Sequence, residues 1–143
     1  MSVTDLTRAI ERFQRADQQT RIELLLDYAR KLPPLPERFH AARDQGLNRV
    51  HECQSPVYLW VEVENGEVQL YADAPREAPT VRGFVSLLLR VIAGASPQEV
   101  MALPGDLLDR LGLTSLLGMT RVHGLTAILQ RVKRMAAEAA AAA

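Results

Sequence analysis

The hydrophobic positions between Thr4 and about Leu32 recur with the spacing of an α-helix. One apolar stripe at i, i+3, i+4 and i+7 is formed by Ile22, Leu25, Leu26 and Ala29. Asp17 is suited to cap a helix N-terminus, so it divides this stretch into two predicted helices. The prolines between positions 33 and 36 end the pattern, because proline lacks the N–H group that a helix interior needs. We expect residues 33–46 to form a long loop, and long loops in compact domains are often functional.

Strict alternation of apolar and polar residues predicts a β-hairpin over residues 57–72. The apolar positions are Val57, Leu59, Val61 and Val63 before the turn and Val68, Leu70 and Ala72 after it. The pair Asn65-Gly66 between the two runs is typical of a two-residue type I′ turn. Such a turn sets Glu64 opposite Glu67, and counting outward places both apolar sets on one face.

The opposite face of this hairpin carries two large aromatic residues. The predicted register sets Trp60 opposite Tyr71, and we interpret them as a cross-strand pair covered by a helix or a loop. A docking patch is the alternative, since aromatic residues are enriched at interfaces. The segment from Leu47 to His51 is a candidate third strand, which would put Cys53 in a loop between two strands.

Helical periodicity returns after the hairpin. The segment from Val81 to Ile92 is apolar nearly all round, which predicts a buried central helix, and Gly94 follows in a position that suits a C-terminal cap. Ser96-Pro97-Gln98-Glu99 combines an N-cap, a first-turn proline and a capping-box glutamate, so it starts a short helix. A final helix runs from about Thr120, and we expect its alanine-rich end, residues 136–143, to fray.

These elements predict one α+β domain over residues 1–143, with a small antiparallel sheet of about three strands packed by helices. No apolar run approaches the roughly 18 residues that a membrane span needs. The N-terminal segment is interrupted by charged residues and does not resemble a signal peptide. We therefore expect a soluble cytoplasmic protein.

The charge balance argues against nucleic acid or an anionic membrane as a partner. The chain carries 17 basic and 17 acidic side chains and has a formal net charge of zero. Residues 47–79 are nevertheless acidic, with two basic groups against six acidic ones, whereas residues 80–143 carry seven basic groups against four. An acidic setting raises the pKa of a thiol, so activation of Cys53 would have to come from another segment or from a partner.

Cys53 is the only cysteine of the chain. It cannot form an internal disulfide or a thiolate metal cage, which leaves an inert thiol or a single-thiol nucleophile. Its neighbours Glu52 and Gln54 and the following Ser-Pro pair indicate a loop, whereas structural cysteines usually lie within an apolar pattern. This position favours the nucleophile.

The run Glu-Cys-Gln-Ser-Pro-Val-Tyr at 52–58 resembles the signature of the SufE family, whose members usually have Gly-Cys-Gln-Ser followed by an apolar and an aromatic residue. Other landmarks of the family follow in the same order. They are Asp73 after the second strand, Thr80-Val81-Arg82-Gly83 at the start of the buried helix, and Leu113-Thr114 followed by Thr120-Arg121-Val122-His123-Gly124-Leu125. The resemblance covers nearly the whole chain.

This resemblance implies a sulfur carrier for iron–sulfur cluster assembly. A SufS-type cysteine desulfurase, which carries pyridoxal phosphate, would hold a persulfide, and this protein would take its outer sulfur and stimulate the desulfurase. The sulfur would then move to an Fe–S scaffold of the SufBCD type. The protein would be an accessory protein with no cofactor or metal of its own, and a monomer or weak homodimer of the SufE/IscU-like fold.

The resemblance also assigns roles to individual residues. Cys53 would be the persulfide site, and the supporting or partner-contacting residues would be Glu52, Gln54, Ser55, Asp73 and Arg121. Glu52 departs from the glycine usual in the family, which changes the charge and backbone freedom of the loop. Because a persulfide is lost to reductants and oxidants, we expect the resting thiol to lie in an apolar pocket and to swing out on docking.

Other interpretations of these residues remain open. Arg121 is the best internal candidate for lowering the pKa of the thiol, but it is equally suited to a solvated or helix-capping role. Asp73 is most simply an ordinary turn residue. The competing function is a small cysteine-dependent hydrolase or acyl transferase that uses Cys53 with His51 or His123. The sequence lacks the oxyanion-type glycine motif that such an enzyme would need, so it favours the sulfur carrier.

Overall fold

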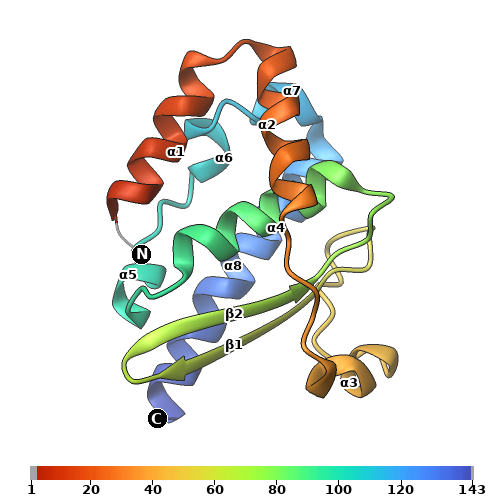
Figure 1. The fold of residues 1–143 in the computed structure, drawn as a ribbon, viewed down its shortest axis with the longest axis vertical. Helices are drawn as coiled ribbons and strands as arrows, with labels where there is room; N and C mark the ends of the chain where they lie inside the picture. The colour runs from red at the N-terminus through yellow and green to blue at the C-terminus, as the bar shows by residue number, and fades with distance from the viewer. Residues whose placement is uncertain (1–2, 143) are drawn as a thin grey trace.

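The computed structural model describes residues 3–142, which form helices around a two-stranded sheet (Figure 1). The helices are α1 (Val3–Arg15), α2 (Gln18–Arg30), α3 (His40–Asp44), α4 (Pro79–Ile92), α5 (Pro97–Met101), α6 (Leu107–Arg110), α7 (Thr114–Leu117) and α8 (Met119–Ala142). A short 3-10 helix, η1 (Glu37–Phe39), precedes α3, and the strands are β1 (Tyr58–Glu64) and β2 (Glu67–Asp73). This arrangement confirms the predicted α+β class.

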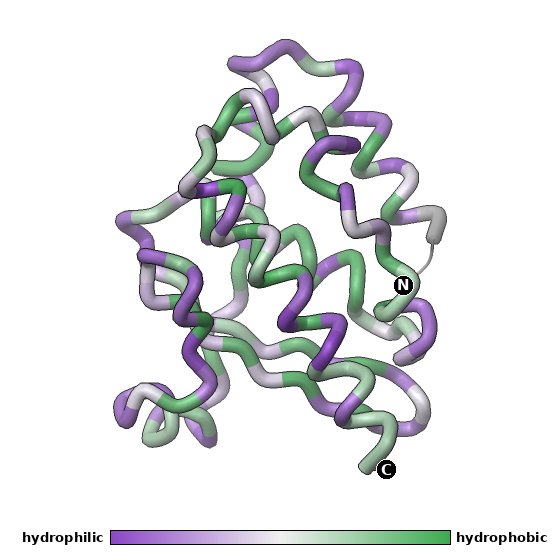
Figure 2. The backbone as a smooth tube through the Cα atoms, turned by 180° about the vertical axis from the view of Figure 1, so that it is seen from behind, coloured by the Kyte–Doolittle hydropathy of each residue, from purple (hydrophilic) through white to green (hydrophobic). Residues whose placement is uncertain are grey.

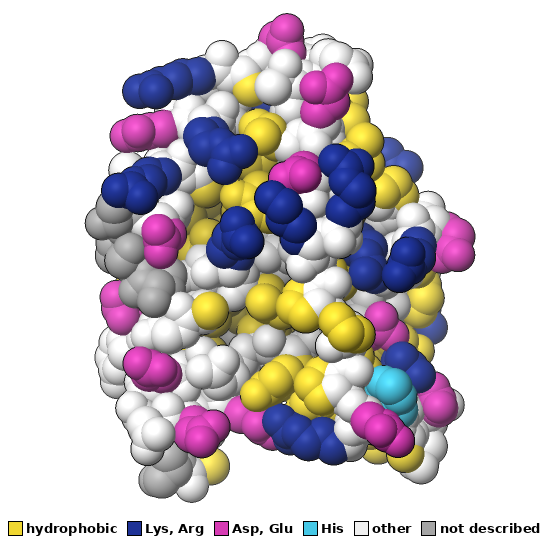
Figure 3. Space-filling model, viewed as in Figure 1, with side chains coloured by type: hydrophobic (Ala, Val, Ile, Leu, Met, Phe, Trp, Pro, Cys, Tyr) yellow, Lys and Arg dark blue, Asp and Glu magenta, His cyan; other side chains and the backbone are white. Residues whose placement is uncertain are grey.

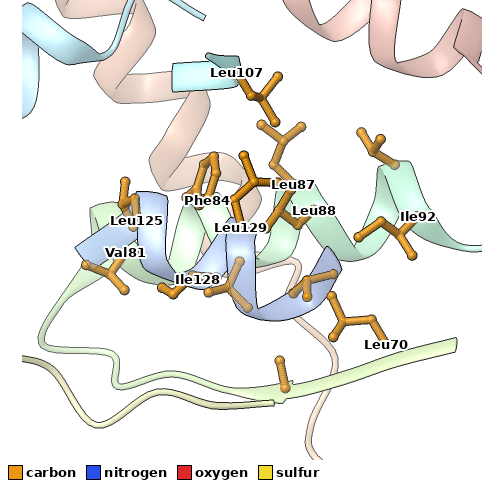
Figure 4. Packing of buried hydrophobic residues seen from close by; sticks show 14 of the residues in the cluster. Leu70, Val81, Phe84, Leu87, Leu88, Ile92, Leu107, Leu125, Ile128 and Leu129 are labelled. Carbon is orange, nitrogen blue, oxygen red and sulfur yellow. The ribbon is translucent and has the colours of Figure 1, made fainter. Parts of the chain in front are cut away.

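Helix α4 lies at the centre of the molecule, as its apolar sequence predicts. It packs against α2 on one side and against α8 and β2 on the other, and side chains from α4 and α8 meet in one cluster (Figure 4). Phe84, Leu88 and Ile92 are completely buried there. Gly83 allows the close approach of α2, because a Cβ at this position would lie 2.2 Å from the carbonyl oxygen of Leu25.

The predicted caps divide the helices where expected. Asp17 accepts a hydrogen bond from the backbone N–H of Thr20 and caps α2. Ser96 and Glu99 form both bonds of a capping box at α5. The turn between α1 and α2 is hydrophilic and lies at the outer end of the molecule (Figure 2). Capping polar groups therefore separate helices that the hydrophobic pattern alone would join.

The hairpin has the predicted register. Glu64 pairs with Glu67, Val61 with Leu70, and Trp60 with Tyr71. Asn65 and Gly66 both have positive φ angles, of 54° and 77°, as a type I′ turn requires. The local sequence thus determines which side chains of β1 and β2 face the helices.

The outer face of the hairpin is covered by the proline-rich segment that follows α2. The ring of Phe39 lies 4.8 Å from that of Trp60 and 5.2 Å from that of Tyr71, measured between centroids. Arg38 forms two 2.8 Å hydrogen bonds with the carboxylate of Glu62 on β1. The aromatic pair is therefore covered, as predicted, and residues 33–46 contain η1 and α3 instead of being an extended loop.

Segment 47–51 does not form the predicted third strand. The sheet has two strands, and segment 47–51 contributes only an isolated antiparallel bridge between Arg49 and Tyr58. Asn48 has a positive φ of 62°, and residues 51–55 turn immediately afterwards, so no regular strand continues. Cys53 nevertheless lies in the loop between the bridged residue Arg49 and β1.

Helix α8 continues through the alanine-rich segment to Ala142. Ala136 is completely buried, so the first residue of that segment belongs to the core. Fraying of the remainder stays a prediction. Among residues 3–142, no helix is long and apolar enough to cross a membrane.

Candidate functional site

Cys53 lies in a short loop closed at its base by backbone hydrogen bonds. The N–H of Val50 donates to the carbonyl of Val57 at 2.9 Å, and the N–H of Cys53 donates to the carbonyl of Val50 at 3.2 Å. The Cys53 side chain is only 5% exposed and belongs to the hydrophobic core cluster, together with Val57 and Leu59. The expected burial of the resting thiol is therefore confirmed.

Gly124 of α8 is the neighbour that permits this burial. A Cβ built on Gly124 would lie 3.3 Å from the Cys53 sulfur and 3.4 Å from its Cα. The shorter of these distances is tighter than nine in ten real contacts of a Cβ atom. A Cβ at this position would require the cysteine loop to shift by a few tenths of an ångström, and a larger side chain would require more.

A cavity of about 260 Å³ opens beside the thiol. It is lined by the cysteine loop (residues 53–55), by residues 77–81 at the start of α4, and by Thr120, Arg121 and Gly124 of α8. Three segments that are far apart in the sequence therefore meet around one sulfur atom. The cavity offers space for an additional atom on Cys53 or for a reacting group from another molecule.

Burial is the main influence on the thiol, and it raises the pKa of Cys53 above its ordinary value. A hydrogen bond from the backbone N–H of Ser55 and the positive charge of Arg49 oppose this rise without cancelling it. The thiol is consequently protonated at neutral pH in the isolated protein. Its reactivity as a nucleophile depends on a change in its surroundings.

The cysteine loop is also tied to the outer side of α8. Arg131 lies 3.8 Å from a carboxylate oxygen of Glu52 and donates a long, 3.5 Å hydrogen bond to the carbonyl of Arg49. Because Glu52 is about half exposed, this ion pair is a weak tether. The glutamate that departs from the family pattern thus holds the loop from outside, while Gly124 accommodates it from inside.

Not all the residues singled out in the sequence lie near the thiol. Arg121, Gln54 and Ser55 line the cavity with Cys53. Asp73 does not: it ends β2 and forms a 3.1 Å ion pair with Arg43 of α3, which fits the structural interpretation. The carboxylate therefore anchors the segment around α3 and lies outside the cavity.

Neither histidine proposed as a general base lines the thiol cavity. His51 is exposed and lines a separate surface cavity with Arg131, whereas His123 is exposed on α8. Across residues 3–142, no cluster of three or more His, Cys, Asp or Glu side chains could hold a metal ion. The chemistry that the described residues support is that of a single shielded thiol beside an arginine.

The SufE family profile, described as an Fe-S metabolism associated domain, matches residues 7–136. The chain belongs to the SufE family. The resemblance seen in the cysteine motif thus extends over the whole domain, and a sulfur-related role in Fe–S metabolism follows from SufE membership.

Individual SufE relatives match over most of their length. An uncharacterized SufE-like protein of Mycobacterium tuberculosis is 37% identical over 135 residues, which are 94% of this chain and 92% of the relative. A SufE-like protein of Synechocystis is 34% identical over 133 residues, which are 92% of this chain and 80% of the relative. The solution structure of a hypothetical protein from Thermus thermophilus has a TM-score of 0.81 at 36% identity and covers 99% of both chains.

Two residues of the site were not predicted to be part of it. Gly124 was noted only as part of the SufE-like run at 120–125, with no role of its own. A glycine within a helical pattern can nevertheless indicate that another backbone approaches closely. Arg49 was counted only as one of the few basic groups in an acidic segment. Its effect on the thiol depends on how the loop folds back, and the sequence carries no signal for that.

Proposed function

We propose that this protein accepts sulfur from a cysteine desulfurase onto Cys53 and carries it to an iron–sulfur cluster assembly scaffold. Membership of the SufE family supports the general role. The finer assignment is a SufS-type desulfurase as donor and a SufBCD-type scaffold as acceptor. In this proposal the protein is an accessory protein without a cofactor of its own, acts in the cytoplasm as a monomer or weak homodimer, and stimulates the desulfurase.

One observation carries the proposal: the single thiol of the chain is buried at the edge of a cavity on a loop. A carrier must shield its sulfur from reductants and oxidants between two encounters, and a buried position provides that shielding. A second thiol nearby would attack the persulfide and release the sulfur, and the chain has no second cysteine. The site therefore suits storage of one sulfur atom better than repeated turnover of a small substrate.

The transfer is an exchange between a thiolate and a persulfide. The Cys53 thiolate attacks the outer sulfur of the donor persulfide, a new S–S bond forms on Cys53, and the donor S–S bond breaks. The donor cysteine leaves as a thiolate, and the proton lost from Cys53 passes to solvent or to the donor. No net oxidation or reduction occurs, so no further reactant is needed.

Docking of the desulfurase is the natural trigger for this step. In the isolated protein the raised pKa of Cys53 keeps the thiol protonated, and burial limits access to the sulfur. A partner that opens the cysteine loop would remove this shielding and bring the sulfur toward the donor. Arg121 is exposed and lines the same cavity, and in this proposal it stabilises the thiolate or contacts the partner once the loop has opened.

Mass spectrometry of the intact protein tests the proposal. Incubation with free cysteine and the cognate desulfurase is expected to add the mass of one sulfur atom, removable by a reductant, and to raise desulfurase turnover. Cys53→Ser is the matched control and should gain no sulfur. Because Cys53 is the only cysteine, any persulfide on this chain is assigned to it without peptide mapping.

Two results would overturn the proposal. One is stimulation of the desulfurase by Cys53→Ser to the same extent as by the unmodified protein. The other is hydrolysis of thioesters or esters that disappears in Cys53→Ser while no persulfide forms. The second result would support the cysteine hydrolase instead.

A further inference from the structure

A second cavity, of about 280 Å³, lies where α2 and α4 cross. Three arginines surround it and apolar side chains form its floor; the residues are Arg30, Arg76 and Arg82, with Leu26, Leu32 and Pro79. We call this cavity the arginine groove. Figure 3 shows Lys and Arg side chains spread over the helical part of this face, where α1, α2 and α4 lie, with hydrophobic side chains exposed between them.

Arg82 is a fixed positive charge in this groove. Its Nε donates to the carbonyl of Ala29 at 3.0 Å, and its Nη1 donates to the carbonyl of Ala74 at 2.6 Å. These bonds join α2 and the end of the hairpin to α4. Its Nη2 donates to no acceptor among residues 3–142, so one N–H₂ group of a rigid guanidinium is available to a ligand.

The other two arginines are only loosely engaged. Arg30 lies 3.5 Å from Asp27, whose other carboxylate oxygen accepts a 2.8 Å bond from Lys31. Arg76 is exposed in the segment between β2 and α4, and within the described part of the chain its side chain forms no hydrogen bond or ion pair. Both side chains are free to turn toward a bound group without losing a strong interaction.

The groove continues the surface around the thiol. Pro79 lines both the arginine groove and the cavity beside Cys53. A protein that docks over the Cys53 cavity therefore also reaches the groove. The same contact would not be available to a partner that bound the far face of the hairpin.

The charge of the groove indicates the chemistry of a ligand that would fit it. Its lining residues include three guanidinium groups and no carboxylate, in a chain whose net charge is zero. Guanidinium groups pair with carboxylates through two parallel hydrogen bonds. Because the floor of the groove is apolar, the ligand that fits combines a carboxylate with an adjacent hydrophobic group.

We propose that the arginine groove binds an acidic segment of the cysteine desulfurase that inserts a hydrophobic side chain between Arg30, Arg76 and Arg82. This inference rests on the proposed function and names a second contact for the same partner. Contacts at the groove hold the desulfurase while the cysteine loop opens. The groove residues then provide affinity for the desulfurase, whereas Cys53 accepts the sulfur.

The double variant Arg30→Gln/Arg76→Glu tests the groove without touching Arg82, which also has a structural role. Isothermal titration with the cognate desulfurase is expected to show about tenfold weaker binding, since an attractive charge at the groove is removed and another is reversed. The salt dependence of binding should become shallower. The desulfurase concentration for half-maximal persulfide formation should rise by a similar factor. At saturating desulfurase, the variant should form as much persulfide as the unmodified protein.

Arg12→Gln/Arg15→Glu is the matched control, because it makes the same charge changes on exposed arginines at the end of α1, outside the groove. It should bind the desulfurase as the unmodified protein does. Equal weakening by both double variants would mean that only net charge matters and would overturn the inference. Unchanged affinity of the groove variant for the desulfurase would overturn the inference as well. So would a groove variant that no longer self-associates but still binds the desulfurase normally.

The two proposals fail in different ways. If the unmodified protein gains no persulfide, the proposed function fails whatever the groove binds. If the persulfide forms and the groove variant binds normally, only the groove inference fails.

Discussion

The sulfur of Cys53 packs directly against the backbone of α8 at Gly124, and this contact sets how deeply the cysteine loop can sit. A glycine inside a helix costs about 1 kcal/mol relative to alanine. Helix α8 accepts this cost at the one position where a Cβ would lie 3.3 Å from the Cys53 sulfur. The glycine is thus required by the site and not by the helix.

Gly124→Val is expected to push the cysteine loop away from α8 and to expose the thiol. Overpacking of this kind costs about 1–3 kcal/mol, so alkylation of Cys53 at neutral pH should accelerate about tenfold or more. Timed labelling with iodoacetamide measures the effect. Ala139→Val, which introduces the same side chain near the end of α8, should leave the labelling rate unchanged; equal rates for the two variants would contradict the role of Gly124.

The pH dependence of the thiol follows from its burial. Because the pKa of Cys53 is raised in the folded protein, the midpoint of its alkylation rate should lie above that of a free cysteine. The unfolded chain loses the thiol proton at a lower pH than the folded protein does. The free energy of unfolding should therefore fall as the pH rises between the ordinary and the raised pKa.

Labelling and thermal unfolding across the alkaline range check this expectation. In Cys53→Ser, the free energy of unfolding should fall less steeply with rising pH, because the thiol no longer contributes. Arg49→Gln should move the alkylation midpoint further upward, because Arg49 favours the thiolate. A midpoint at or below that of free cysteine would show that burial does not control the thiol.

Residue roles differ in how far the sequence reveals them. The loop position of Cys53 was predictable from its polar neighbours and the Ser-Pro pair that follows, and Arg121 does line the same cavity. Asp73 follows the strand as expected, but its partner Arg43 comes from a segment whose fold the sequence did not indicate. Local pattern identifies candidate residues, whereas their contacts depend on distant segments.

At the scale of elements, the crossing of α2 and α4 organises the helical part of the molecule. The two helices approach at Gly83, where only a hydrogen atom fits against the carbonyl of Leu25. Arg82 reinforces the same crossing by donating to the carbonyl of Ala29. The arginine groove and the cysteine cavity lie on either side of Pro79, at the start of α4, so the position of this helix fixes both.

Gly83→Ala is expected to destabilise the protein by about 3 kcal/mol or more. The added Cβ would lie 2.2 Å from a backbone oxygen, which cannot move aside as a flexible side chain can. Urea unfolding followed by circular dichroism measures the free energy of unfolding. Gly105→Ala is the matched control, since its nearest neighbour would be a side-chain atom at 4.0 Å, and it should change stability by less than about 0.5 kcal/mol.

Elements defined by short-range signals were predicted well. The Asn65-Gly66 turn and strict alternation fixed the register of β1 and β2, and capping groups placed the starts of α2 and α5. The third strand was wrong because segment 47–51 alternates too briefly and turns at Asn48. The segment after α2 contains η1 and α3, and Phe39 packs there on the hairpin; no local pattern predicted these two short helices.

At the scale of the whole molecule, the hairpin separates two environments. One face of the sheet packs on α4 and α8, whereas Trp60 and Tyr71 on the other face are covered by Phe39. Cys53 belongs to the first environment. The cover formed by residues 33–46 therefore contributes to stability without taking part in the thiol site.

Phe39→Ala should lower the free energy of unfolding by about 3–5 kcal/mol, the usual loss for a buried phenylalanine. Trp60 is the only tryptophan, so its emission should shift to longer wavelength as water reaches the ring. Leu47→Ala, at a residue that is 51% exposed, should change neither quantity appreciably. Unfolding monitored by Trp60 fluorescence measures both effects, and equal stabilities of the two variants would show that Phe39 does not serve as a cover.

The tight fit between Cys53 and Gly124 has a consequence for recognition. A persulfide extends the side chain by a second sulfur, about 2 Å beyond the first, and the side facing Gly124 has no room for it. The extra atom must occupy the neighbouring cavity, among Arg121 and the residues at the start of α4. An empty carrier and a loaded one would then present different surfaces. An acceptor could distinguish the two by shape before any bond is exchanged, and an unloaded carrier would not compete for its binding site.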